Sequence, residues 1–133
     1  MNTIVTSINY LAVLVSTLVY YVIGFLWFTK LFGEAWRKET GVPADRKPGP
    51  VALVGQFIST LLYTIGIAIL INLLDTPGIM GGICAAVIAT IFFAIPINSG
   101  DLFFTGKKRL FLLNVSERAV GSLVVGIILG IWE

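Results

Sequence analysis

The last apolar run of the chain, residues 110–132, constrains the fold most, because it is long enough to cross a bilayer and yet carries charged side chains. Asn114, Glu117 and Arg118 lie inside it at the helical positions i, i+3 and i+4, so they share one face of the helix. Burying a charge at bilayer depth costs about 3 kcal/mol on insertion scales unless the side chain meets protein or water. The run therefore requires other helices that shelter this face.

Three further apolar runs supply such helices. Of the 133 residues, 57% are hydrophobic and 12% charged, whereas soluble domains have about half and a quarter. We predict an all-α integral membrane protein, a single transmembrane domain over residues 1–133 whose four helices contact the lipid bilayer. The predicted helices cover about residues 8–28, 51–74, 79–104 and 109–132. The first is expected to be retained rather than cleaved as a signal, because no Lys or Arg precedes it.

A short amphipathic helix is expected between the first two spans, at about residues 31–39. Phe32 and Trp36 lie on one side of it and charged residues on the other, so it is predicted to lie flat in the cytoplasmic membrane interface. The tight turn at residues 75–78 makes the second and third spans antiparallel neighbours. Pro96 is expected to kink the third span near its end.

Lys and Arg are distributed asymmetrically over the connecting segments. Eight of the nine lie in two loops, and the ninth is Arg118. The loop after the first span holds five and the loop after the third holds three: Lys30, Arg37, Lys38, Arg46 and Lys47, then Lys107, Lys108 and Arg109. Loops rich in Lys and Arg stay in the cytoplasm, so we expect a multi-pass plasma membrane protein with both termini outside the cytoplasm.

Several classes of chemistry lack their usual residues. The sequence contains no histidine and a single cysteine, Cys84, which excludes His-based and Cys-rich metal sites and the Ser-His-Asp and Cys-His catalytic sets. The net charge of +2 is too small to indicate nucleic acid as a partner. We therefore predict no catalytic residues, no metal and no cofactor.

The polar residues of the third and fourth spans form the predicted site. With the membrane boundary at the second basic loop, helix geometry places Asp101 about 6 Å, Asn98 about 10 Å and Arg118 about 13 Å into the membrane. We expect Asp101 to pair with Arg118, with Asn98 and Asn114 as hydrogen-bonding neighbours. Glu117 pairs with Arg118 of another subunit, faces a cavity or is protonated. The cluster either holds the helices together or forms a substrate or proton pathway.

The fourth span also carries a small residue at every fourth position, namely Ser122, Gly126 and Gly130. Small residues let another helix approach closely, so this stripe predicts a helix-packing surface. The partner helix lies either in the same chain or in another copy. Because four helices bury little internal surface, we expect a homo-oligomer or a subunit of a larger membrane complex.

Distinct motifs are spread over nearly the whole chain, and residues 98–106, N-S-G-D-L-F-F-T-G, form the most specific one. The others are Asn9-Tyr10-Leu11, residues 24–28 followed by Leu31-Phe32-Gly33 and Trp36, and residues 112–121 with Asn114 and Arg118. In these motifs the chain resembles the small bacterial membrane proteins grouped as domain-of-unknown-function family 1761. The resemblance implies a four-helix protein of the bacterial inner membrane without established activity.

The same resemblance implies that Asn98, Asp101, Asn114 and Arg118 occupy the polar motif positions of the family. Glu117 departs from this pattern, because the family has a tyrosine or similar residue there. A role of Glu117 would then be peculiar to this chain. The family offers no catalytic residues to transfer.

Three functional hypotheses follow. The leading one is a non-enzymatic inner-membrane protein that acts through helix association, as an oligomer or an accessory subunit. The alternative is a small transporter or channel whose polar pathway passes Asp101, Glu117 and Arg118. An enzyme acting on a lipid-soluble substrate ranks third, because two carboxylates and an arginine occur without a nucleophile, a metal set or a cofactor loop.

Overall fold

The computed structural model describes residues 7–43 and 45–132, and this part of the chain is helical, without strands. Four helices in it are long and apolar enough to cross a membrane: Tyr10–Leu31, Pro50–Leu74, Gly78–Phe103 and Lys108–Ile131. The predicted all-α bundle of four membrane-spanning helices is confirmed.

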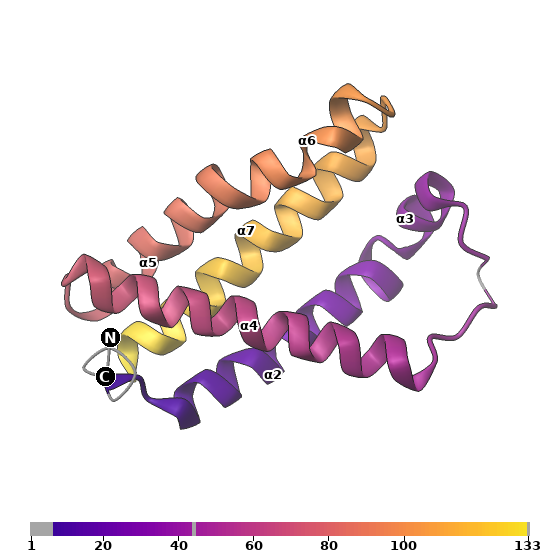
Figure 1. Cartoon of the computed structure of the whole chain (residues 1–133). Helices are drawn as coiled ribbons and strands as arrows, with labels where there is room; N and C mark the ends of the chain where they lie inside the picture. The colour runs from indigo at the N-terminus through magenta and orange to yellow at the C-terminus, as the bar shows by residue number, and fades with distance from the viewer. Residues whose placement is uncertain (1–6, 44, 133) are drawn as a thin grey trace.

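Two of these spans consist of more than one element (Figure 1). The elements in chain order are α2 (Tyr10–Leu26), the π-helical turn η1 (Trp27–Leu31), α3 (Gly33–Thr40), α4 (Pro50–Leu74), α5 (Gly78–Ala89), the π-helical turn η2 (Thr90–Ala94), α6 (Ile95–Phe103) and α7 (Lys108–Ile131). The short helix expected after the first span is α3, which begins after Phe32 rather than at residue 31.

Residues suited to helix ends define the bounds of α2 and α4. The side chain of Asn9 caps α2 by accepting a hydrogen bond of 3.2 Å from the Ala12 N–H. Pro50 occupies the first turn of α4, where no helical partner exists for the N–H that it lacks. Asp75 ends α4 in the left-handed conformation, with φ 53°, and starts the tight turn to α5. The second and third spans are therefore antiparallel neighbours.

The third span contains the π-helical turn η2 directly before α6. Pro96 is the second residue of α6. A proline lacks an N–H, and its ring clashes with the carbonyl four residues earlier, here that of Phe92. A π-helical turn accommodates this by shifting the hydrogen-bond register before the proline. The hydroxyl of Thr90 supports the turn by donating to the Ala86 carbonyl at 2.9 Å. The irregularity that the sequence predicts at Pro96 thus takes the form of a widened turn.

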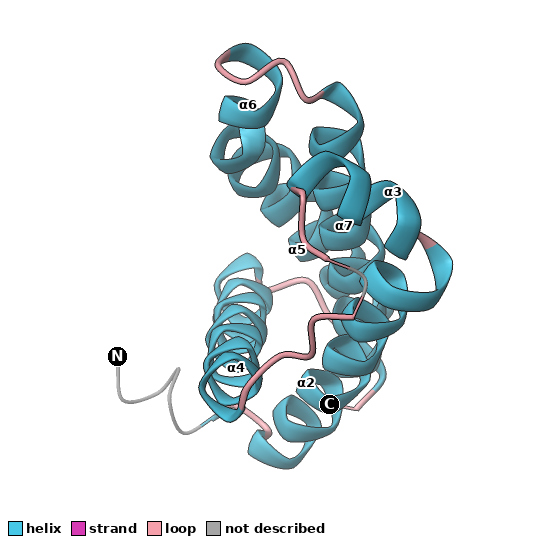
Figure 2. Ribbon diagram, turned by 90° about the vertical axis from the view of Figure 1, so that its right-hand side faces the viewer, coloured by secondary structure: helices cyan, strands magenta, loops and turns pink. Residues whose placement is uncertain are grey.

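The last spanning helix, α7, is the central helix of the bundle. It packs against α2, α3, α4, α5 and α6 (Figures 1 and 2). A run with buried charges needs such surroundings, because every other span then shelters part of its surface.

The small-residue stripe of α7 packs against helices of the same chain. A Cβ atom added to Gly126 would clash with the backbone of Gly82 in α5, and one added to Gly130 would meet the backbone of Gly78. The third member, Ser122, is fully buried and hydrogen-bonds to a side chain of α4. The close approach that small residues allow is therefore used within this chain.

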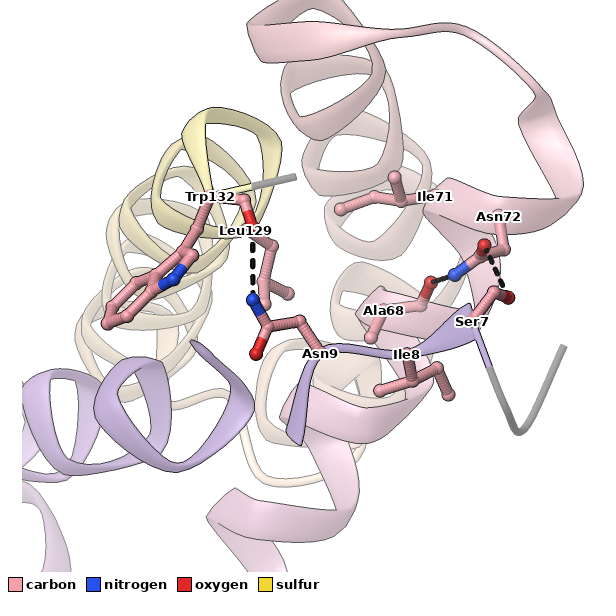
Figure 3. A pocket seen from close by; sticks show the side chains of 8 residues that line it. All are labelled: Ser7, Ile8, Asn9, Ala68, Ile71, Asn72, Leu129 and Trp132. Atoms are coloured by element: carbon pink, nitrogen blue, oxygen red, sulfur yellow. Dashed lines mark hydrogen bonds between the residues drawn. The ribbon is translucent and has the colours of Figure 1, made fainter. Parts of the chain in front are cut away.

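Apolar side chains close the end of the bundle where α2 begins and α7 ends. We call them the apolar closing layer, and they are Ile8, Ala12, Val13, Ile67, Ala68, Ile71, Val125 and Leu129. Beside this layer lies a cavity of about 290 Å³ (Figure 3), where Asn9 donates to the Trp132 carbonyl at 3.1 Å and Ser7 donates to Asn72 Oδ1 at 3.1 Å. The first of these bonds joins the start of α2 to the end of α7.

Both basic loops lie at the opposite end of the bundle (Figure 1). Lys107 Nζ donates to the Glu39 carbonyl at 2.9 Å, which links the loop before α7 to α3. The two loops therefore share one side of the membrane, as the charge count requires.

Aromatic contacts hold α3 on the end of the first span. The ring of Trp36 lies 6.0 Å from that of Phe28, and the ring of Phe32 lies 4.8 Å from that of Trp27, centroid to centroid. The two aromatic residues predicted for an interfacial helix thus contact the adjacent span.

Candidate functional site

Arg118 is the centre of a group of polar side chains inside the bundle. Its Nη1 atom donates a hydrogen bond of 2.9 Å to the Tyr20 hydroxyl of α2. The guanidinium carbon lies 4.9 Å from the ring centroid of Tyr63 and 5.7 Å from that of Tyr20. Cation–π contacts stabilise by about 0.5–1 kcal/mol at exposed sites and about 2 kcal/mol when desolvated. The guanidinium is therefore held by two tyrosines and does not face hydrocarbon.

Tyr20 and Tyr63 meet edge to face, with ring centroids 5.8 Å apart. Tyr20 fits between the helices because Gly121 has no side chain, and a Cβ atom there would clash with the ring. The Tyr63 hydroxyl lies 2.7 Å from the Ser122 hydroxyl, so the two share a hydrogen bond. Neither tyrosine is among the residues predicted from the sequence. In the sequence, both can be recognised as tyrosines that lie inside apolar runs, far from both membrane interfaces. A hydroxyl buried at such a position needs a hydrogen-bond partner.

Glu117 lies beside this group and is almost entirely buried, with 6% of its surface exposed. Its Oε2 atom is 3.9 Å from Arg118 Nε, which is an ion pair within one chain. The carboxylate fits against α2 at Gly24, since a Cβ atom there would stand 3.1 Å from Oε1. A buried carboxylate without a nearby cation would be strongly destabilising, so Arg118 is the reason that Glu117 is tolerated at this depth.

The predicted pair of Asp101 and Arg118 is wrong. Asp101 Oδ2 accepts a hydrogen bond of 3.3 Å from Asn114 Nδ2, whereas Arg118 contacts the tyrosines and its neighbouring glutamate. Depth is the reason, because Arg118 lies one helical turn beyond Asn114, where α2 is the nearer partner. Asn98 donates to the Ala94 carbonyl of its own helix at 2.8 Å. The predicted cluster is therefore divided into a shallow part and a deep part.

A cavity of about 950 Å³ opens beside Arg118. Its walls come from α2, η1, α3, residues 42–43 and 46–49, α4, α6 and α7. Gln56 and Thr60 line it from α4, Asn98 lines it from α6, and Asn114 lines it from α7. Figure 1 shows that α4 and α6 diverge toward the loop end, and both helices contribute residues to the cavity lining. Its volume is in the range of small-molecule binding sites.

Basic side chains line the cavity at two levels. Arg37 of α3 and Arg46 and Lys47 of the following loop, here called the basic rim, lie at the loop end. Arg118 lies deeper, about 15 Å along α7 from its first residue. Among the described residues that line the cavity, Glu117 is the one acidic side chain. The lining therefore attracts anions.

The donors in the cavity suit the binding of an anion. The side chain of Arg118 remains 29% exposed, and the contacts given above leave most of its five N–H groups for another acceptor. Charge-assisted hydrogen bonds from a guanidinium to a carboxylate or phosphate are about twice as strong as neutral ones. Within the described part of the chain, no group of three or more His, Cys, Asp or Glu side chains could hold a metal ion.

The family model described as "Protein of unknown function (DUF1761)" matches residues 11–130. No match was found among curated proteins or among solved structures.

Proposed function

The chain belongs to the family of proteins of unknown function DUF1761, and we propose that within it this protein is a non-enzymatic small transporter that binds a charged molecule in the cavity beside Arg118. One observation carries the proposal: a cavity of about 950 Å³ ends on a partly exposed guanidinium in the interior of four membrane-spanning helices. Intramembrane ionisable residues that line such a cavity are typical of substrate pathways.

The two ends of the bundle differ in a way that supports transport. The cavity beside Arg118 reaches the loop end, whereas at the other end the apolar closing layer between α2, α4 and α7 lies between this cavity and the smaller one at Asn9. A transporter with a central site needs one closed side at a time, so this arrangement corresponds to a state open toward the basic loops. The proposed pathway passes Tyr20, Glu117 and Arg118. Asp101 does not line the cavity and is left out of it.

The position of the basic loops supports a location in the bacterial inner membrane, with both termini outside the cytoplasm. The Lys107 to Glu39 bond holds the two basic loops together, and such loops stay in the cytoplasm. The cavity would then open toward the cytoplasm. That the protein forms an oligomer or is an accessory subunit stays a prediction. The small-residue stripe on which this prediction was based packs against α5 and α4 of the same chain.

Thiol labelling tests whether water reaches the cavity. Gln56→Cys lines the cavity about 9 Å along α4 at an exposed position, whereas Ile58→Cys, at a similar depth, lies on the exposed outer surface of the helix. Both are made in a Cys84→Ser background. A membrane-impermeant methanethiosulfonate reacts only where a thiol ionises in water, so it should label Gln56→Cys from the loop side and spare Ile58→Cys. Equal labelling of both, or of neither, would contradict a water-accessible cavity.

Transport itself is tested in proteoliposomes. The labelled probes are inorganic phosphate, acetate, glycerol phosphate and a fluorescent short-chain phospholipid. At least one is expected to cross faster with the protein than without it, and Arg118→Gln should lower that rate at least tenfold. Arg109→Gln removes a cation from the exposed start of the same helix and serves as the matched control. If the cavity labels as expected and no probe crosses, the transport role fails while the binding site remains.

A further inference from the structure

We infer that the ligand of this cavity is an anionic amphiphile, a phosphate ester with an apolar chain, and this inference rests on the proposed binding role of the cavity. Both basic and apolar side chains line the cavity. Basic groups lie at the rim and at depth, while Phe25 of α2, Phe28 of η1 and Leu53 of α4 add apolar surface to the lining. A molecule that is charged at one end and apolar at the other would contact both kinds of side chain.

The charges of the cavity lining indicate that the polar group of the ligand is negatively charged. Arg37, Arg46, Lys47 and Arg118 line the cavity against the single carboxylate of Glu117. That carboxylate offsets the charge of Arg118, so the three rim cations give the lining a net positive charge. Several cations around one site favour a phosphate, whose three or more oxygens accept from more than one donor. A cationic ligand would meet like charges at the mouth and is disfavoured.

Exposed apolar surface beside the cavity indicates that the other part of the ligand is an apolar chain. The first turns of α4 carry Val51, Leu53, Val54 and Ile58 with 40–87% of their surface exposed, as expected for contact with lipid chains. Figure 1 shows this part of α4 diverging from α6. The cavity is therefore bounded on one side by a helix that lipid reaches, at the depth where phospholipid headgroups meet acyl chains.

The basic rim also distinguishes this site from simple attraction to a membrane surface. Lys108 and Arg109 lie at the same end of the bundle and are exposed, but they do not line the cavity. Attraction of anionic lipid to the surface would involve these two residues as much as Arg46 and Lys47. A bound headgroup would involve only the pair that lines the cavity.

The test measures binding of added lipid to the purified, detergent-solubilised full chain by native mass spectrometry. The probes are phosphatidylglycerol, phosphatidylcholine with the same acyl chains, glycerol phosphate and inorganic phosphate. We expect phosphatidylglycerol to bind at least tenfold more tightly than each of the others. The double variant Arg46→Gln/Lys47→Gln should weaken it about thirty-fold, because each cation near a lipid phosphate contributes about a fivefold factor. The matched control Lys108→Gln/Arg109→Gln should change it less than twofold.

The other results separate failure of this inference from failure of the proposed function. Equal losses in the two double variants would mean surface attraction and overturn the inference. Equal binding of glycerol phosphate and phosphatidylglycerol would assign the site to a soluble phosphate and overturn the amphiphile. No binding of any probe, with Gln56→Cys still labelled, would overturn the anionic amphiphile and leave an accessible cavity for another ligand class. No binding together with an unlabelled Gln56→Cys would overturn the cavity and the proposed function as well.

Discussion

The Tyr20 hydroxyl accepts a hydrogen bond of 2.9 Å from Arg118, and this bond joins the first and the last membrane-spanning helices across 98 positions of sequence. The same tyrosine ring packs on Gly121 and meets Tyr63 of the second span edge to face. Tyrosines of two other spans therefore hold the arginine of the last span, which is why a charged residue is stable at this depth.

Arg118→Ala should lower the free energy of unfolding by about 2 kcal/mol, because it leaves the Glu117 carboxylate buried without its cation. The loss stays below the 3–5 kcal/mol typical of fully buried pairs, since Arg118 is partly exposed. Unfolding in mixed micelles with increasing denaturing detergent measures it. The double variant Arg118→Ala/Glu117→Gln should recover at least half of the loss. Strictly additive losses would show that the two side chains do not interact.

Tyr20→Phe should destabilise the protein by about 1 kcal/mol, because the ring contacts remain while the hydroxyl that accepts from Arg118 is lost. Tyr21→Phe is the matched comparison: its hydroxyl donates to the Leu53 carbonyl at 2.9 Å in an exposed position, where solvent or lipid headgroups replace the bond. Its expected loss is below about 0.5 kcal/mol. The same micellar unfolding measurement compares the two, and equal losses would contradict the role given to Tyr20.

Gly126→Ala should destabilise the bundle by about 1–3 kcal/mol or prevent its assembly, because the added methyl group overlaps the backbone of Gly82. Gly66→Ala is the control, since a Cβ atom at that helical position meets nothing within 4 Å. It should be neutral or slightly stabilising. Yield of monodisperse protein and its thermal unfolding temperature distinguish the two. A normal yield and unfolding temperature for Gly126→Ala would mean that α5 and α7 are further apart than described.

A reporter fused after residue 133 tests the orientation. Alkaline phosphatase is active only outside the cytoplasm, whereas green fluorescent protein that has been exported unfolded does not fluoresce. We therefore expect an active phosphatase fusion and a non-fluorescent green fluorescent protein fusion. A cysteine at Lys108 should be labelled only after the cytoplasmic side is opened. The reverse pattern would place the basic loops and the mouth of the cavity outside.

The spans could be read from the sequence because hydropathy and length alone identify them. The sequence also predicts an irregularity at Pro96, from a proline inside an apolar run, and the short helix after the first span, from its apolar and charged faces. That the irregularity is a π-helical turn before the proline is known only from the structure. What remained open was which helices pack together. The stripe of Ser122, Gly126 and Gly130 predicts close contact with a helix, but the partner depends on three-dimensional neighbours that spacing does not encode.

The site was only partly predictable for the same reason. Glu117 and Arg118 were identified because charges in an apolar run are rare, whereas Tyr20 and Tyr63 count as ordinary members of such runs. The expected partner of Arg118 was Asp101 because it lies on the adjacent helix in sequence. The actual partner lies on α2, and only the arrangement of the helices brings it to that depth.

The crossing of Gly82 and Gly126 has a mechanical consequence. Backbone touches backbone there, so no rotamer can change to let the two helices slide or separate. The α5 and α7 pair is then a fixed frame. In the proposed transport cycle, opening the apolar closing layer would require α2 or α4 to move, because both helices contribute residues to it. For α4, the turn at Asp75, which joins it to this frame, is the point about which it would move.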